Sequence, residues 1–334
     1  METLKTQKLV IDEGINMDKL EHFRTMLTMR HFDEACLEGV PTGEIHGELH
    51  TGIGQEAIGA ALKACLEPGD AVVSTHRNHY HAIAAGVPLR GMLAEIFEKE
   101  TGLCQGRGGH MHIFDKAHNF SCTGIVGASL PVALGYAYKF WMHDEPQVAV
   151  AVTGDGGTNN GTFHECLNIA GAWNLPLVLL VENNLLAISV SIDEVLATPT
   201  IAERAAAYGA WGQKVDGTEV DTVTSALAEA VDHARAGKGP AVLEATCYRF
   251  RGHFEGDHDS YRRMDDKRTM REKFDPITLY RNKLLADGVA SEAELDELTA
   301  ASQQEMTALL ESVRADTLPD ATGARDYVFV GKHA

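Results

Sequence analysis

The sequence is short of basic residues. Its 334 residues include 48 Asp and Glu against 29 Lys and Arg, which gives a formal net charge of -19. Binding to nucleic acid depends on clustered Lys and Arg side chains that neutralise phosphates. Nucleic acid is therefore excluded as a partner, and any anion that the chain binds must be held by a few local groups.

Long apolar runs and paired cysteines are also missing. No stretch approaches the roughly 18 consecutive apolar residues of a membrane-spanning helix, and the start, "METLKTQKLVIDEG", has no apolar run behind its charges. No C-x-x-C pair occurs among the six cysteines, so we expect reduced thiols. With a hydrophobic content of 44%, these absences favour a globular, cytoplasmic protein without a membrane partner.

Three common site signatures are absent as well. The stretch "GDGGTNNG" at 154–161 has Asn159 where a dinucleotide-binding turn needs glycine, and no Gly-x-x-x-x-Gly-Lys-Ser/Thr loop occurs. The stretch "HECLN" at 164–168 ends in Asn rather than the second histidine of a zinc protease, and no cysteine lies at ligand spacing. A nicotinamide-dependent dehydrogenase and a zinc site are therefore disfavoured, although histidines cluster at His76, His79, His81, His110 and His112.

The remaining pattern alternates short apolar runs with helical segments. Buried strands are predicted at 71–75, 147–153, 175–183 and 239–250, and helical periodicity between them indicates a doubly wound, mainly parallel α/β sheet. The glycine-rich segment 101–128 is predicted to be a functional loop.

Helices are expected at both ends of the chain. Residues 17–38 have the spacing of a long helix, and Ser291 with Glu294 forms a capping box that opens a helix reaching about Arg314. We expect an N-terminal helical arm over 1–40, an α/β domain over 41–270 and a helical C-terminal extension over 271–334.

Polar residues follow two of the predicted strands. Asp155 comes directly after 147–153, and Asn183 and Asn184 end 175–183. Ligands in open α/β sheets bind beyond the carboxyl ends of the strands, and a right-handed crossover brings Asp155 and Asn184 together there. A carboxylate and an amide oxygen suit magnesium or calcium. The glycines at 154, 156 and 157, followed by a helix N-terminus, would let a diphosphate approach the backbone.

The segment "GDGGTNNGTFHECLNIAGAWNLPLVLLVENN" resembles the thiamin-diphosphate motif in the α subunits of 2-oxo-acid dehydrogenases and acetoin dehydrogenases. Six further segments follow the order of that family: "HTGIGQEAIGAAL", "THRNH", "GRGGHMHIFD", "GIVGASLPVALG", "YRFRGHFEGD" and "YR" at 261–262. The resemblance covers nearly the whole chain. It implies the thiamin-diphosphate-binding fold for residues 41–270, with thiamin diphosphate and magnesium as cofactors.

The resemblance also implies a role for individual residues. Asp155 and Asn184 would ligate magnesium, and Leu186 would add its main-chain carbonyl where the family commonly has Tyr. His50 and His253 would be the catalytic histidines. The implied cofactor contacts are His76, Arg77, Arg249 and His253 near the diphosphate, Gly154, Asp155, Gly156, Gly157 and Asn184 around the metal, and Gly124 and Val126 at the aminopyrimidine.

The chain has one α/β domain where this chemistry normally builds each site from two. The resemblance therefore implies a separate β subunit, an α2β2 assembly and a lipoyl-bearing acyltransferase that accepts the acyl unit. The substrate could be a 2-oxo acid such as pyruvate or an acyloin such as acetoin. A two-chain ketol transferase and a non-catalytic paralogue remain alternatives.

Three departures from the family pattern lie near the mouth of the expected site. His76 replaces a frequent Tyr, His110 replaces a common Ser, and Phe254 stands where some relatives have a serine that is phosphorylated. Control by phosphorylation at that position is not expected. Because the departures lie at the mouth of the site, they bear on the identity of the substrate more than on that of the cofactor.

Overall fold

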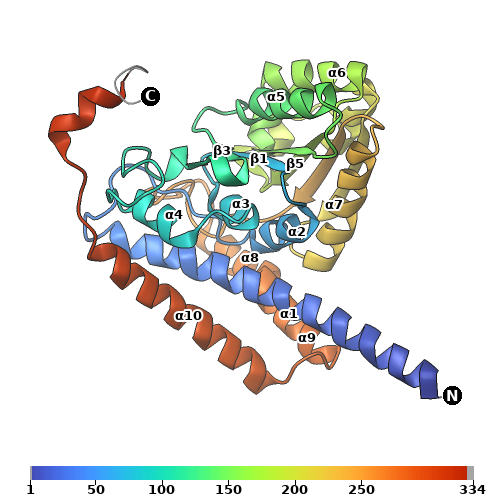
Figure 1. Cartoon of the computed structure of the whole chain (residues 1–334), viewed down its shortest axis with the longest axis horizontal. Helices are drawn as coiled ribbons and strands as arrows, with labels where there is room; N and C mark the ends of the chain where they lie inside the picture. The colour runs from blue at the N-terminus through green and yellow to red at the C-terminus, as the bar shows by residue number, and fades with distance from the viewer. Residues whose placement is uncertain (1, 329–334) are drawn as a thin grey trace.

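A seven-stranded sheet forms the centre of the molecule (Figure 1). The computed structural model describes the backbone of residues 2–328, and the side chains of residues 19–328 except 324, 326 and 327. The strand order is β2-β3-β1-β4-β5-β9-β8, and every neighbouring pair is parallel except β2 with β3. The strands of this sheet are β1 (Ala71–Ser74), β2 (Phe114–Asp115), β3 (Phe120–Cys122), β4 (Ala149–Gly154), β5 (Leu177–Asn183), β8 (Trp211–Asp216) and β9 (Ala241–Thr246). The predicted α/β class with a mainly parallel sheet is confirmed.

The central strands are buried on both faces. Successive residues of a strand point to opposite sides, and two hydrophobic clusters divide the strands in this way. In β4, Val150 and Val152 belong to one cluster while Ala149 and Ala151 belong to the other. This double burial explains why "QVAVAVT" reads as a continuous apolar run rather than an alternating one.

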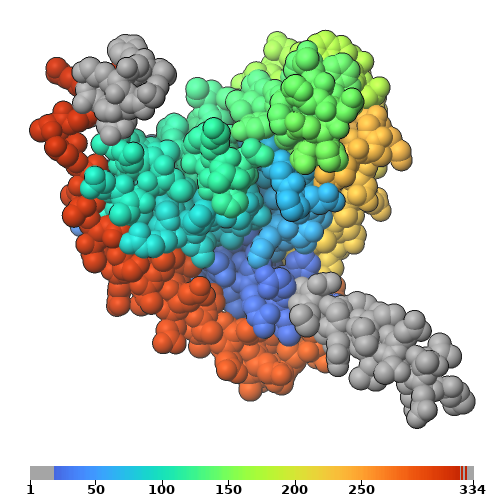
Figure 2. Space-filling view, in the orientation of Figure 1, coloured from blue at the N-terminus to red at the C-terminus, as the bar shows by residue number. Residues whose placement is uncertain are grey.

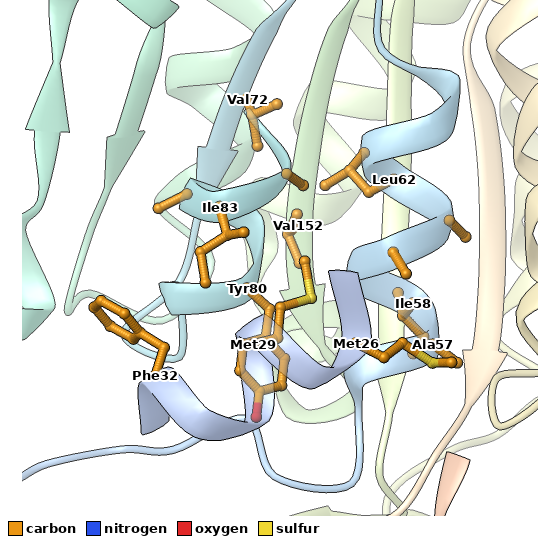
Figure 3. Packing of buried hydrophobic residues seen from close by; sticks show 14 of the residues in the cluster. Met26, Met29, Phe32, Ala57, Ile58, Leu62, Val72, Tyr80, Ile83 and Val152 are labelled. Atoms are coloured by element: carbon orange, nitrogen blue, oxygen red, sulfur yellow. The ribbon is translucent and has the colours of Figure 1, made fainter. Parts of the chain in front are cut away.

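Helices cover the two faces unequally. The smaller cluster lies under α5 (Ser129–Met142) and α6 (Gly161–Trp173), which form the upper lobe in Figure 2. The larger cluster lies under the remaining core helices, where Met29 of α1 packs beside Tyr80 of α3 and residues of α2 (Figure 3). Those helices are α1 (Glu2–Gly39), α2 (Glu56–Cys65), α3 (His79–Ala84), α4 (Leu89–Ile96) and α7 (Val220–Arg235), and buried residues of two C-terminal helices extend the same cluster.

The C-terminal region is helical and returns to the start of the chain. α8 (Met264–Phe274) and α9 (Pro276–Ala286) precede α10 (Glu292–Arg314), which lies along α1 (Figure 1). The capping box of Ser291 and Glu294 opens α10 as expected. A buried ion-pair group ties these parts together: Arg30 of α1 donates to Glu56 at 2.6 Å and to Asp275 at 3.1 Å.

Three strands of the central sheet were missed from the sequence: β2 and β3, which pair with each other inside the predicted loop 101–128, and β8. β3 lies inside the predicted loop 101–128 and pairs with β1, so that segment is not loop throughout. It also contains a short 3₁₀ helix at His110–His112. β8 is an edge strand in which every second residue is exposed, and the polar residues of "WGQKVD" mask the apolar pattern of a strand.

Candidate active site

A cavity of about 250 Å³ opens at the carboxyl ends of the parallel strands. Its wall includes residues that follow β1 (75–77), end or follow β4 (154–157), follow β5 (184 and 186–188) and follow β9 (249 and 253), and a further segment, 125–127, precedes α5. This is the edge where open α/β sheets bind ligands. Eleven of the residues implied by the resemblance line it, namely His76, Arg77, Val126, Gly154, Asp155, Gly156, Gly157, Asn184, Leu186, Arg249 and His253.

Asp155 and Asn184 come from neighbouring strands and converge at the cavity. Thr153 pairs with Val181 and Gly154 with Glu182, so the two loops begin at the same level of the sheet. Oδ2 of Asp155 and Oδ1 of Asn184 are buried, and neither has a hydrogen-bond partner among the described residues. Buried polar atoms are normally partnered, so these two oxygens are suited to an absent ligand that accepts lone pairs.

Electrostatics support a cation at this point. Burial raises the pKa of Asp155 to about 6, and the backbone N–H groups of Asp155, Gly156 and Asn184 together with Arg249 offset part of that effect. The turn after β5 is unusual, because Leu185 and Ile188 have positive φ angles of 69° and 54°. Leu186 lies between them on the cavity wall. A carboxylate, an amide oxygen and a nearby main-chain carbonyl form a hard donor set that fits magnesium.

The glycines at the end of β4 differ in the free space around the position that a Cβ atom would occupy. A Cβ at Gly154 would meet nothing within 4 Å, and its φ of -83° suits any residue. Neither packing nor backbone geometry demands glycine there, so the free space is available to a ligand. At Gly157 a Cβ would lie 2.2 Å from Oγ1 of Thr153, and at Gly156 it would lie 2.6 Å from Cβ of Ala187. These two glycines serve close packing of the loop.

Two buried arginines supply positive charge. Arg77 donates to the carbonyl of Thr51 and, at 2.9 Å, to that of His253. Arg249 donates to the carbonyl of Ile188 at 3.0 Å and to the hydroxyl of Tyr261 at 2.7 Å. Burial, followed by the charge of Arg249, lowers the pKa of Arg77 to about 10, so both groups remain cationic at neutral pH. Carboxylates nearby, such as Glu182 for Arg77 and Asp259 for Arg249, offset only part of the effect of burial on the pKa of the two arginines. An anion in the cavity would balance the remaining charge.

Three imidazole rings gather beside the arginines. The ring of His50 lies 4.5 Å from that of His76 and 5.0 Å from that of His253, measured between centroids. Burial, followed by the charge of Arg77, lowers the pKa of His76 to about 3 and that of His253 to about 4. All three rings are therefore neutral at pH 7, since burial also lowers the pKa of His50.

One ring nitrogen from each of these histidines lies within 4.8 Å of the others, a spacing at which all three could ligate one metal ion. The hydrogen bonds argue against it. Nη1 of Arg249 lies 3.3 Å from Nδ1 of His253, so Nδ1 must accept and the proton of the neutral ring is on Nε2. A protonated nitrogen cannot ligate a metal, so this ring faces the site as a donor.

The structure places two implied residues outside the cavity wall. His50 is 3% exposed and is not part of the cavity wall, but its ring contacts those of His76 and His253, which are. Gly124 lies near Met111, whose Sδ would be 3.7 Å from a Cβ there. Val126 lines the cavity and is 55% exposed.

Glu182 lines the cavity and was missed from the sequence. It precedes the two asparagines at the end of β5, is 4% exposed, and its Oε1 lies 3.1 Å from Nε2 of His81. Nδ1 of His81 in turn lies 2.8 Å from Oγ of Ser74. Glu182 directly precedes Asn183 at the end of a predicted strand, and this position was the sequence feature that could have identified it.

A second missed residue organises the approach to the site. The buried carboxylate of Glu95 accepts hydrogen bonds from the N–H groups of Cys104, Gly106, Gly108 and Gly109 at 2.6–3.3 Å. These contacts shape the glycine-rich loop that leads to His110.

No helix among residues 2–328 is long and apolar enough to cross a membrane.

Comparisons with known proteins identify the family of the chain. A family model described as dehydrogenase E1 component matches residues 24–322. The pyruvate dehydrogenase E1 component subunit alpha of Rhizobium meliloti is 36% identical over 313 residues, which cover 93% of this chain and 90% of the relative. The alpha subunit of the acetoin:2,6-dichlorophenolindophenol oxidoreductase of Bacillus subtilis is 40% identical over 284 residues, 84% of this chain and 85% of the relative. The chain therefore belongs to the dehydrogenase E1 component family.

Proposed function

We propose that the chain is the α subunit of a thiamin-diphosphate-dependent dehydrogenase that cleaves a pyruvate-like 2-oxo acid or an acetoin-like acyloin. One observation carries the proposal: Asp155 and Asn184 present unpartnered buried oxygens at adjacent strand ends, in a cavity that also holds Arg77 and Arg249. Relatives named for pyruvate and for acetoin support both substrate types.

The proposed metal is magnesium, held by Oδ2 of Asp155, Oδ1 of Asn184 and the carbonyl of Leu186. Magnesium keeps open positions for phosphate oxygens. The positive charges of Arg77 and Arg249 would balance the rest of the diphosphate, and Gly154 leaves room for it beside the backbone. Main-chain groups of Gly124 and Val126 are the proposed contacts to the aminopyrimidine.

When bound, thiamin diphosphate supplies the electron sink for cleavage of a carbon–carbon bond next to a carbonyl. The protein's own contribution is to position charge and hydrogen-bond donors. In this proposal His253 and His50 donate N–H groups to a substrate oxygen on which negative charge develops. His76 lies in ring contact with both and narrows the same end of the cavity.

The proposal includes a β subunit in an α2β2 assembly, and a lipoyl-bearing acyltransferase as acceptor. Exposed apolar residues support a protein partner: Ile125 at the cavity mouth is 73% exposed, and Trp141 and Trp173 stack on the surface of α5 and α6 with centroids 6.4 Å apart. Monomeric proteins seldom expose such groups together. Residues 41–270 would be the cofactor-binding domain, between the arm 1–40 and the extension 271–334, and the complex would work in the cytoplasm.

The test is co-expression with a thiamin-type β subunit, followed by assay of 2-oxo acids and acyloins with an artificial electron acceptor. We expect turnover by the complex and almost none by this chain alone. Full activity of the isolated chain would contradict the two-chain proposal. Turnover only when an aldehyde acceptor replaces the oxidant would indicate a ketol transferase, and cofactor binding without turnover in any combination would indicate a non-catalytic paralogue.

A further inference from the structure

His110 lies directly behind the histidine cluster. Its Nε2 is 3.3 Å from Nδ1 of His50, the two rings stack at 30° with centroids 5.2 Å apart, and both side chains are buried. His50 has no other hydrogen-bonding contact among the described residues, apart from a 4.0 Å approach of its Nε2 to the carboxylate of Glu48. His110 is thus the neighbour that can set the protonation of the His50 ring.

The positions of the protons follow from one further contact. Nε2 of His110 also meets the carbonyl oxygen of Glu48, at short range. A carbonyl oxygen can only accept, so Nε2 of His110 carries the proton. Nδ1 of His50 faces this N–H group and must be the unprotonated nitrogen. Because the His50 ring is neutral, its own proton is on Nε2.

The ring of His110 is itself held in place. Its Nδ1 is buried without a partner among the described residues, as expected of an unprotonated nitrogen, since unpartnered buried N–H groups are rarer. Asn78, which is fully buried, donates to the carbonyl of His110 at 2.7 Å. The loop before His110 is gathered by the carboxylate of Glu95. The backbone on both sides of the ring is therefore constrained.

We infer that His110 is a positioning residue, which holds His50 in the tautomer with the proton on Nε2 and so makes His50 a hydrogen-bond donor, rather than a base, beside the rings of His76 and His253. His253 reaches the same state through Arg249, and its ring lies in contact with that of His50, so two hydrogen-bond donors belong to one cluster. Such a pair recognises a substrate oxygen that carries or develops negative charge. The effect on catalysis rests on the proposed function, whereas the tautomer does not.

The test measures the tautomer and the kinetics separately. The full-length chain, with ¹⁵N in its histidine rings, is examined by NMR at neutral pH, and the His50 signals are assigned by their loss in His50→Gln. Three variants are compared: His110→Ser, which removes the ring, His110→Gln, whose amide N–H can replace the donor, and His118→Gln as a matched control, because His118 pairs with Asp115 instead. The kcat and KM of each variant are measured in the complex with its partner subunit.

We expect a proton on Nε2 of His50 in the wild-type chain and in the Gln and control variants. In His110→Ser, we expect loss of the single tautomer and a fall in kcat of about fivefold or more, the factor that corresponds to one lost hydrogen bond of about 1 kcal/mol, with little change in KM. A proton on Nδ1 of His50 in the wild type would overturn the inference, as would an unchanged tautomer and kcat in His110→Ser. If His110→Ser fails to fold, the position of the His50 proton in the wild-type chain and in His110→Gln still tests the inference. If the complex lacks thiamin-diphosphate-dependent turnover, only the proposed function fails.

Discussion

Oδ2 of Asp155 and Oδ1 of Asn184 stand at the ends of paired strands, buried and without a partner among the described residues. Backbone N–H groups and Arg249 offset only part of the effect of burying the Asp155 carboxylate. Such an arrangement costs stability unless a ligand neutralises the charge.

Asp155→Asn should stabilise the cofactor-free chain while abolishing cofactor binding. The amide keeps the shape of the side chain and removes the charge whose burial raises the pKa of Asp155 to about 6. One pKa unit corresponds to about 1.4 kcal/mol, so the gain in the free energy of unfolding at pH 7 is at most about 3 kcal/mol. Urea denaturation measures the stability, and calorimetry with thiamin diphosphate and magnesium measures the binding. Asp193→Asn, on an exposed neighbouring turn, is the control, and unimpaired binding by Asp155→Asn would contradict the metal assignment.

The convergence of Asp155 and Asn184 could be predicted because it depends on local order. Strands that follow each other through one helix lie side by side in a parallel sheet, so two strand ends close in sequence become neighbours in space. The contact between His50 and His110 could not be predicted, since these residues are 60 positions apart and are joined through the loop that Glu95 organises. β8 was missed because an edge strand keeps polar side chains in contact with solvent.

Gly154→Ala should weaken cofactor binding without destabilising the fold, whereas Gly157→Ala should destabilise the fold itself. A methyl group at Gly154 meets nothing within 4 Å, so stability should be unchanged or raised by up to about 1 kcal/mol, while affinity for the cofactor falls. A methyl group at Gly157 would lie 2.2 Å from Oγ1 of Thr153, and we expect a loss of about 1–3 kcal/mol. Thermal denaturation and cofactor titration of both variants test this. Wild-type affinity in Gly154→Ala would show that the open space is not used by the cofactor.

His76 should make the folded chain sensitive to acid. Burial, then the charges of Arg77, His253 and Arg249, lower its pKa from 6.5 to about 3. Below pH 6.5 the unfolded chain therefore binds more protons than the folded one at this residue, and stability falls as the pH falls. Between pH 7 and pH 5 this residue accounts for about 2 kcal/mol. The drop in the free energy of unfolding over that interval should be smaller by this amount in His76→Gln and unchanged in His118→Gln. An equal drop in His76→Gln and the wild type would show that the ring is solvated.

Glu95 should be essential for the loop that carries His110. Its carboxylate accepts four backbone N–H groups and is fully buried. In Glu95→Gln the side-chain NH2 group faces N–H donors in place of one acceptor oxygen, and we expect a loss of about 2–3 kcal/mol. Residues 104–109 should also become susceptible to proteolysis under native conditions, because the loop would open without global unfolding. Glu100→Gln, at an exposed position on the same segment, should change stability by less than about 0.5 kcal/mol. If Glu95→Gln matched that control in both measurements, the loop would owe its shape to its glycines alone.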